Sequence, residues 1–297
     1  MLYRHFPKIA NEEISIITAT LPGAGGGTAE YTERDLDAFG VNVAYLPPES
    51  EGTVPVRFPF PIIVGMPAWD AKRGCLTADW AAARESKGVR PGDYLLADFS
   101  PMPESLFSNG AAEALRAARA FADAAREAAE TGKIAGFGFR LCRDLPQTRD
   151  AGYSNAVRAI AGSSEDWAFW STDYSMANRG GLEALVRELG ESGVPLLATD
   201  PFCGGSLSNV APEIHALYYG APVPRSHEEW ALRAIWENQD VISAVIPPCG
   251  TEDFAKRCIY AGAGRANSLP EAELKVIRAA GEKLLTQEAK YNTFRKD

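Results

Sequence analysis

Three polar residues that could take part in acid/base chemistry lie at the ends of short apolar runs. Tyr45, Asp98 and Arg140 each stand where a predicted strand closes. In a parallel α/β barrel the carboxyl ends of the strands face the active site, so we predict these three residues as catalytic. An aspartate beside an arginine can transfer protons or hold an anionic substrate. The sequence leaves open an alternative, a structural ion pair between Arg140 and Asp98 or Asp173.

The cysteine and histidine content argues against metal and thiol chemistry. The five cysteines, at positions 75, 142, 203, 249 and 258, include no Cys-x-x-Cys pair, and the chain has three histidines. Structural zinc sites and disulfide frameworks need closely spaced or paired ligands. We therefore predict no metal site. Three cysteines near strand ends, Cys142, Cys203 and Cys249, are interpreted as small buried hydrophobic residues.

The charge balance favours a small-molecule ligand. With 30 basic and 39 acidic residues, the formal net charge is -9, whereas nucleic-acid binding needs clustered lysine and arginine. No apolar run approaches the ~18 residues of a membrane span, and the first eight residues lack the apolar core of a signal peptide. We expect a cytoplasmic protein that binds neither nucleic acid nor membranes.

Apolar strand-like runs alternate with segments of helical periodicity along most of the chain. Strand followed by helix, repeated, is typical of parallel β-sheets. Because the strand candidates number eight, we predict an α/β fold with a single (β/α)8 TIM barrel. The strands are expected at 14–19, 41–46, 61–66, 94–99, 133–140, 167–174, 194–199 and 241–246, and helices at 111–131, 147–162, 180–191, 227–238 and 252–261.

One segment departs from this alternation. Residues 47–60, which follow the second barrel strand, contain four prolines in 14 positions and cannot form an ordinary crossover helix. We expect a shortened region there, with one outer helix truncated or replaced. No linker or repeat divides the chain, so residues 1–297 are predicted as one domain, with 290–297 as a disordered tail.

Eight short motifs follow one another in order along almost the whole chain. They are Tyr3-Arg4-His5-Phe6-Pro7-Lys8, Gly40-Val41-Asn42, Met66-Pro67-Ala68-Trp69, Gly132-Lys133-Ile134-Ala135-Gly136-Phe137-Gly138-Phe139, Asp173-Tyr174, Asp200-Pro201-Phe202-Cys203-Gly204-Gly205-Ser206-Leu207, Trp230-Ala231-Leu232-Arg233 and Ile246-Pro247-Pro248-Cys249-Gly250-Thr251. Together these motifs resemble those of the aldo-keto reductases. The resemblance implies an aldo-keto-reductase-like barrel, and carbonyl reduction with a nicotinamide cofactor through an Asp-Tyr-Lys-His tetrad.

The tetrad itself is missing. The positions that the resemblance assigns to its aspartate, tyrosine and lysine hold Tyr45, Ser50 and Gly65. The histidine position falls on Pro101 in a gapless match and on Ala97 in a gapped one. A phenol without charges that tune its pKa is a poor proton donor, so we expect standard carbonyl reduction to be slower by several orders of magnitude.

The cofactor positions are also altered. Ser171 and Ser175 stand where relatives commonly carry Gln and Asn around the nicotinamide. The resemblance still implies binding of NADP or NAD, weakened, and the absence of any cofactor stays equally open. The predicted cofactor contacts are Tyr174, Asp200, Phe202, Gly204, Gly205, Ser206, Lys256 and Arg257.

Two functions remain open on the sequence. The first is a divergent aldo-keto-reductase-like oxidoreductase that binds a small molecule at the C-terminal face of the barrel. The second is a pseudoenzyme, a non-catalytic subunit or ligand-binding and assembly module. In it, Val54, Val56, Phe58 and Phe60 would contact another copy or a protein partner through segment 54–60. A polar pocket at the mouth would favour the first, and a closed mouth with an apolar patch at 54–60 the second.

Overall fold

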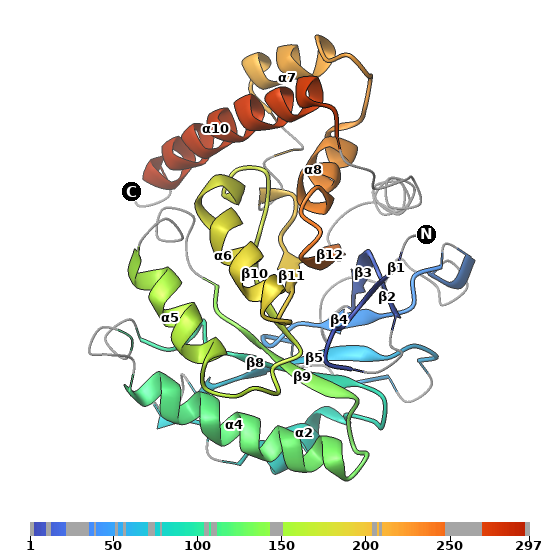
Figure 1. Ribbon diagram of the computed structural model, residues 1–297, viewed down its shortest axis with the longest axis vertical. Coiled ribbons are helices and arrows are strands. Elements are labelled where there is room, and N and C mark those ends of the chain that lie inside the picture. Colours follow the sequence, from blue (N-terminus) through green and yellow to red (C-terminus); the bar gives the residue numbers. More distant parts are fainter. Residues whose placement is uncertain are drawn as a thin grey trace.

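Eight parallel strands close into a barrel in the computed structural model (Figure 1). Each strand pairs with the next along the chain, and β12 returns to pair with β3. The predicted barrel and the places of its strands are confirmed. The strands are β3 (Ile17–Thr20), β4 (Ala44–Leu46), β5 (Ile62–Pro67), β8 (Tyr94–Asp98), β9 (Gly136–Arg140), β10 (Phe169–Asp173), β11 (Leu196–Thr199) and β12 (Val241–Ile246).

The structure describes most, but not all, of the chain. The described residues are 3–9, 13–21, 36–38, 40–50, 53–55, 58–70, 75–77, 79–103, 107, 112–142, 151–203, 207, 210–246 and 269–294. Among them no helix has the length and apolar character needed to cross a membrane.

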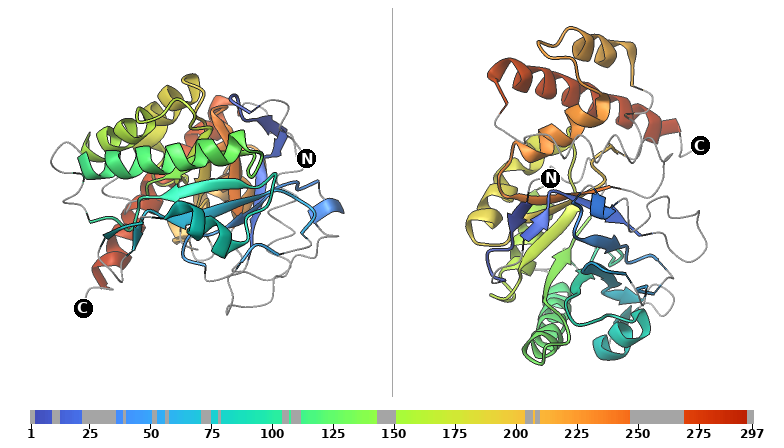
Figure 2. Two further views of the ribbon diagram at one scale, coloured as in Figure 1. Left: turned by 90° about the horizontal axis from the view of Figure 1, so that it is seen from below. Right: turned by 90° about the vertical axis from the view of Figure 1, so that its right-hand side faces the viewer.

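Helices surround the barrel on its outer side (Figure 2). Four of them lie where periodicity predicts, and the helix expected at 252–261 lies outside the described residues. Three others, α2, α7 and α10, were not expected from the sequence. The helices are α2 (Trp80–Lys87), α4 (Ala112–Glu130), α5 (Ala151–Ala161), α6 (Arg179–Glu191), α7 (Pro212–Tyr219), α8 (His227–Trp236) and α10 (Glu271–Phe294).

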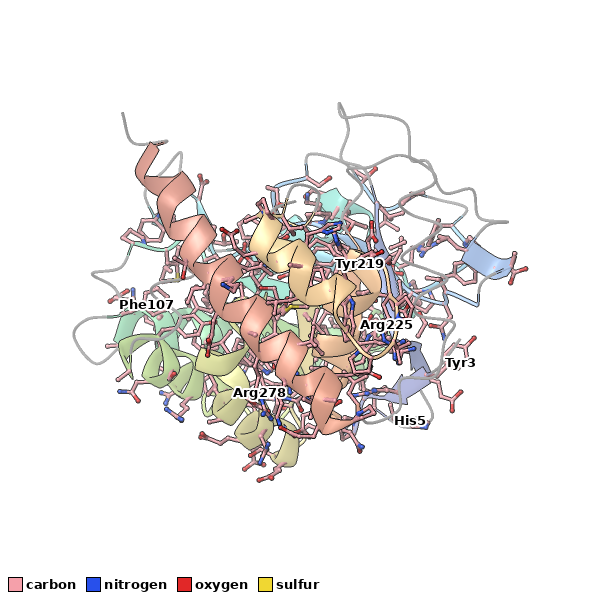
Figure 3. The ribbon with its side chains drawn as sticks, turned by 90° about the horizontal axis from the view of Figure 1, so that it is seen from above. Tyr3, His5, Phe107, Tyr219, Arg225 and Arg278 are labelled. Carbon is pink, nitrogen blue, oxygen red and sulfur yellow. The ribbon has the colours of Figure 1, made fainter. Side chains whose placement is uncertain are left out.

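Helix α10 packs beside α7 at one end of the molecule (Figures 1 and 3). It buries Ile277, Ala280 and Leu284, which recur on one helical face. The guanidinium of Arg225 joins its first turn to α8, at 2.8 Å from Glu273 and 2.6 Å from Glu229. The helix extends to Phe294, into the segment 290–297 that was expected to be a disordered tail.

Two short antiparallel hairpins flank the barrel: β1 (Tyr3–His5) with β2 (Glu13–Ser15), and β6 (Trp69–Asp70) with β7 (Cys75–Leu76). The first of them carries Arg4, whose guanidinium donates to the backbone oxygens of Trp236, Asn238 and Gln239. These carbonyls belong to the last residue of α8 and to two residues just beyond it, where helix carbonyls lack partners. Arg4 therefore caps α8 from the other end of the chain.

The barrel interior is filled by alternate residues of the strands. Along β9 the inward positions are Gly136, Gly138 and Arg140, and the outward ones are Phe137 and Phe139. A β-carbon on Gly138 would lie 2.5 Å from the backbone oxygen of Phe169 and equally close to its ring, so glycine is required there. Other inward residues form one apolar cluster with two residues of the β1–β2 hairpin, Phe6 and Ile14. The remaining members are Val43, Tyr45, Ile63, Tyr94, Leu96, Ala168, Phe169, Leu197, Ile242 and Val245.

The described part of segment 47–60 contains no helix, as its prolines predict. Side chains from α2 and the loop after it bind its backbone carbonyls. Lys87 donates to Ser50, and Arg90 donates to Phe58 at 2.6 Å and Phe60 at 3.0 Å. In a helix, each backbone carbonyl would accept a hydrogen bond from a backbone N–H of the same helix. Here the side chains of Lys87 and Arg90 donate the hydrogen bonds instead.

Apolar side chains of this segment turn toward the protein. Val54 is buried, and Phe58 and Phe60 are half-buried in an edge-to-face pair at 5.7 Å. They pack on the small cluster around Leu36 and Val41. Val56 lies outside the described residues. The partner contact expected through segment 54–60 stays a prediction.

Candidate functional site

Two of the three predicted catalytic residues meet in an ion cluster at the mouth of the barrel, the opening formed by the carboxyl ends of its strands. Asp98, Arg140 and Asp173 end β8, β9 and β10 and project inward. The Nη1 atom of Arg140 lies 3.1 Å from Asp98 Oδ2, and its Nη2 atom 3.9 Å from Asp173 Oδ1. Register alignment places these ends side by side. The cluster thus contains the ion pair that the sequence left open, and it lies where active sites of such barrels form.

Asp98 is the buried anchor of the cluster. Its side chain is 4% exposed. Its Oδ1 atom accepts hydrogen bonds from the backbone nitrogen of Ser100 at 3.0 Å and from the Ser100 hydroxyl at 2.5 Å, while Oδ2 faces Arg140. The carboxylate is therefore engaged within the protein, and its main effect is to position Arg140.

Asp173 is the carboxylate that faces solvent. Its side chain is 33% exposed, in contrast to that of Asp98. The hydroxyl of Thr199 donates to Oδ1 at 2.8 Å, and the thiol of Cys142 donates to Oδ2 at 2.6 Å. The sequence places Asp173 at a strand end, facing the site, and as a possible structural partner of Arg140, but it was not among the three predicted catalytic residues.

Tyr45, the third predicted catalytic residue, lies on β4 with its side chain in the barrel interior. Burial raises the pKa of its phenol above the usual value. The charge of Arg140 acts in the opposite direction, and those of Asp98, Glu49 and Asp173 add to the increase. The phenol therefore stays neutral, and it can donate a hydrogen bond but not act as a phenolate base.

Arg140 stays charged in this setting. Burial by itself lowers the pKa of a guanidinium, but the nearby Tyr45, Asp98, Cys142 and Asp173 outweigh burial, and the pKa of Arg140 is raised. Burial acts in the other direction on a thiol, because the charged form is the anion. Burial, followed by the charge of Asp173, therefore raises the pKa of Cys142. A thiol held in its neutral form is a poor nucleophile, in agreement with the interpretation of this cysteine as non-catalytic.

Two polar atoms below the cluster have no hydrogen-bond partner among the described residues. They are the hydroxyl oxygen of Ser171 and the Nε atom of Arg140, both buried. Ser171 pairs with Arg140 in the register of β9 and β10, and it lies two residues before Asp173, so it faces the barrel interior. Buried polar groups are usually satisfied. These two atoms mark a polar site beneath the mouth.

Three of the eight predicted cofactor contacts, Tyr174, Asp200 and Phe202, lie among the described residues. Tyr174 is fully buried in the apolar layer between the barrel and its helices, and burial raises the pKa of its phenol to about 12. Asp200 adopts a left-handed backbone conformation with φ 46°, and Phe202 is buried. The other five lie outside the described residues: Gly204, Gly205, Ser206, Lys256 and Arg257.

The positions that replace the tetrad leave no room for its lysine. A β-carbon on Gly65 would lie 2.5 Å from Cδ of Pro48, so Pro48 occupies the space that a side chain at position 65 would need. Ala97 is fully buried and belongs to the outer apolar layer. Ser50 is buried, and its backbone oxygen accepts from Lys87.

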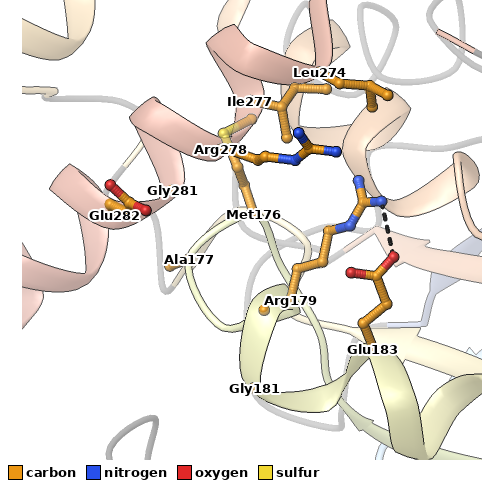
Figure 4. A pocket seen from close by; sticks show the side chains of 11 residues that line it. Met176, Ala177, Arg179, Gly181, Glu183, Leu274, Ile277, Arg278, Gly281 and Glu282 are labelled. Carbon is orange, nitrogen blue, oxygen red and sulfur yellow. Dashed lines mark hydrogen bonds and ion pairs between the residues drawn. The ribbon is translucent and has the colours of Figure 1, made fainter. Parts of the chain in front are cut away.

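A second cavity, of about 450 Å³, lies between α6 and α10 (Figure 4). Its floor contains Met176 and Ile277, both buried. Its charged lining side chains are two arginines and two glutamates, Arg179, Arg278, Glu183 and Glu282. Both arginines are paired: Arg179 lies 3.4 Å from Glu183, and Arg278 lies 3.1 Å from Glu271. Because this lining carries no net charge and its two cations are engaged, the mouth is the stronger candidate site.

Comparison with solved structures identifies the fold. No protein-family model and no curated protein sequence matches the chain. The aldo-keto reductase AKR11C1 from Bacillus halodurans (holo form) superposes with a TM-score of 0.60 over 94% of this chain and 96% of that chain, at 17% identity. An aldo-keto reductase from Klebsiella pneumoniae in complex with NADPH gives 0.61 over 95% and 96%, at 14% identity. The glycerol dehydrogenase AKR11B4 from Gluconobacter oxydans gives 0.60 over 92% and 93%, at 12% identity. The chain thus has the aldo-keto reductase fold, as the motifs predicted.

Proposed function

We propose that this protein is a divergent aldo-keto-reductase-like barrel that binds a small molecule at its mouth through Tyr45, Arg140 and Asp173. The observation that carries the proposal is the ion cluster itself. Asp98 and Arg140 lie largely removed from water, with the partly exposed Asp173 beside them, and burying charges is unfavourable unless each is well paired. The cluster lies at the strand ends where barrels of this architecture bind their substrates. Such a cluster supports binding rather than a purely structural role.

Each residue has a distinct part in this proposal. The neutral phenol of Tyr45 donates a hydrogen bond to an oxygen of the ligand. Arg140 is held in place by Asp98 and stabilises the polar groups around it. Asp173 offers its exposed oxygens as acceptors, and it is the residue that can take a proton from the ligand.

Standard carbonyl reduction is not the activity that we propose. One of the fold relatives named above was solved in complex with NADPH. Here Pro48 fills the space beside Gly65, so position 65 has no room for a lysine side chain. Ser50 stands where the resemblance places the tyrosine, so the proton donor of the reductase chemistry and the lysine that tunes its pKa are both replaced.

The described residues do not fit a nicotinamide ring in the predicted way. The ring of Tyr174 has no exposed face on which a cofactor could stack, because it is fully buried in the core. We propose that NADP and NAD bind weakly, and we assign no reaction step to them.

A binding experiment tests the site. A fragment library is screened by saturation-transfer NMR against the wild type and against Tyr45→Phe and Asp173→Ala. Fragments bound by the wild type should lose affinity in both variants, by about twofold to tenfold for a lost neutral hydrogen bond and more for the carboxylate. Tyr219→Phe, a change on the exposed surface of α7, is the matched control and should have no effect. Fragments that bind all four proteins alike would place the ligand elsewhere.

A titration with NADPH and NADH, followed by tryptophan fluorescence and calorimetry, tests the cofactor part. We expect no binding at micromolar concentrations. Micromolar binding would overturn this part of the proposal, since it would mean that loops outside the described residues hold the dinucleotide. A search among carbonyl substrates would then follow.

A further inference from the structure

We infer that the ligand of the mouth carries a protonated amine, which lies against Asp173, and an oxygen that reaches toward Arg140 and Ser171. The inference rests on the proposed function and adds the chemical class of the ligand. The class is that of small amino alcohols and related amino-carbonyl compounds.

The first step is the charge at the mouth. Three carboxylates, Asp98, Asp173 and Glu49, and one guanidinium, Arg140, lie near enough to act on the Tyr45 hydroxyl. Glu49 is exposed at the end of β4. The described charges around this hydroxyl therefore sum to a negative value. A cation is attracted to such a site, and an anion is repelled.

The second step concerns Arg140, which the sequence offered as a holder of anionic substrates. Its Nη1 atom faces Asp98 at 3.1 Å, and its Nη2 atom lies 3.9 Å from Asp173. A carboxylate ligand would need the bidentate face of the guanidinium, which Asp98 and Asp173 already border. An anion at this place would also meet both carboxylates. Arg140 is thus unsuited to bind a carboxylate or phosphate.

The third step is the free acceptor capacity of Asp173. An ionised carboxylate has about four acceptor positions. Thr199 and Cys142 use one on each oxygen, and the side chain is 33% exposed. The remaining positions face the mouth, where an ammonium group can donate to them. Charge-assisted hydrogen bonds of this kind are among the stronger ones in proteins.

The fourth step is an independent observation beneath the cluster. The Ser171 hydroxyl is fully buried, faces the barrel interior and has no partner among the described residues. The Nε atom of Arg140 is also buried and has no partner among them. Two donors in a buried site call for an acceptor. A hydroxyl or carbonyl oxygen on the ligand supplies one, whereas a simple alkylamine does not.

The test compares three probes of similar size and different charge: 1-amino-2-propanol, 1,2-propanediol and lactate. Each is titrated calorimetrically into the full-length protein and into Asp173→Asn and Asp123→Asn. Asp123 is an exposed carboxylate on α4 and serves as the control. We expect 1-amino-2-propanol to bind best. We expect Asp173→Asn to weaken it about tenfold to a hundredfold, as for a lost hydrogen bond to a charged group, with no change in Asp123→Asn.

The outcomes separate this inference from the proposed function. Tighter binding of the diol or of lactate, lost in Tyr45→Phe, would keep the mouth as a small-molecule site and overturn the amine. A preference for the amine that persists in Asp173→Asn would also overturn it. If no probe binds and the fragment screen finds no ligand that depends on Tyr45 or Asp173, both ideas fail. Unfolding curves of each variant show that the comparison is made between folded proteins.

Discussion

Replacing Arg140 by methionine should destabilise the protein far more than replacing an arginine on its surface. Methionine keeps much of the length of the side chain but leaves Asp98, 4% exposed, without its counter-charge. Breaking a buried ion pair from one side costs about 3–5 kcal/mol. Because Ser100 still donates two hydrogen bonds to Asp98, we expect the lower end of that range.

The magnitude can be separated into its parts by a double-mutant cycle. Asp98→Asn with Arg140→Met removes the uncompensated charge, so the double variant should lose less free energy than the sum of the two single variants. Arg158→Met is the control. Arg158 pairs with Glu188 at 2.7 Å on the surface, where both side chains are more than 40% exposed. Such pairs contribute less than about 1 kcal/mol.

Urea denaturation followed by tryptophan fluorescence measures these differences, since Trp167, Trp170 and Trp230 are fully buried. At about 2–4 °C per kcal/mol, a loss of about 3 kcal/mol in Arg140→Met should lower the Tm by roughly 6–12 °C. If Arg140→Met costs no more than Arg158→Met, the cluster is solvated. The argument that buried charge marks the site would then be refuted.

Three further predictions follow from packing and burial. Gly65→Ala should destabilise the fold by about 1–3 kcal/mol, because its β-carbon would overlap Pro48. Gly180→Ala on α6 has open space around the new β-carbon and should stabilise the fold by about 1 kcal/mol. Thermal unfolding of the two variants distinguishes these effects. Arg90→Ala removes the donor to the carbonyls of segment 47–60 and should speed its cleavage by chymotrypsin in limited proteolysis, with unchanged cleavage as the contrary result. Burial raises the pKa of three of the ten tyrosines, Tyr45, Tyr174 and Tyr218. In an alkaline titration of the folded protein, followed by absorbance at 295 nm, these three should stay protonated up to about pH 11. Ionisation of all ten tyrosines below that pH would contradict the prediction.

Local signals along the chain would have revealed two of the missed helices. Asp79 accepts a hydrogen bond from Ala82 at 2.9 Å, and Gly88 ends α2 in a left-handed conformation with φ 69°. Helix α7 begins with Pro212 in its first turn. Both are ordinary start and stop signals. Periodicity does not predict α2 and α7, because each has eight residues and a segment of that length shows little helical periodicity.

The sequence by itself determined the barrel and part of its site. Buried parallel strands need continuous apolar runs, so their number and order are legible along the chain. The carboxyl ends of such strands converge, so a pairing of Asp98 with Arg140 could be foreseen.

Only the tertiary structure decided how each side chain is used. It turned Tyr174 into the outer core, left Asp173 in solvent while burying Asp98, and placed Pro48 against Gly65. It also brought Arg4 to the end of α8, more than 230 residues away. Strand periodicity states which residues share a face, but not which segment distant in sequence covers that face. Exposure and charge partners depend on that covering, and they exist only once the barrel has closed.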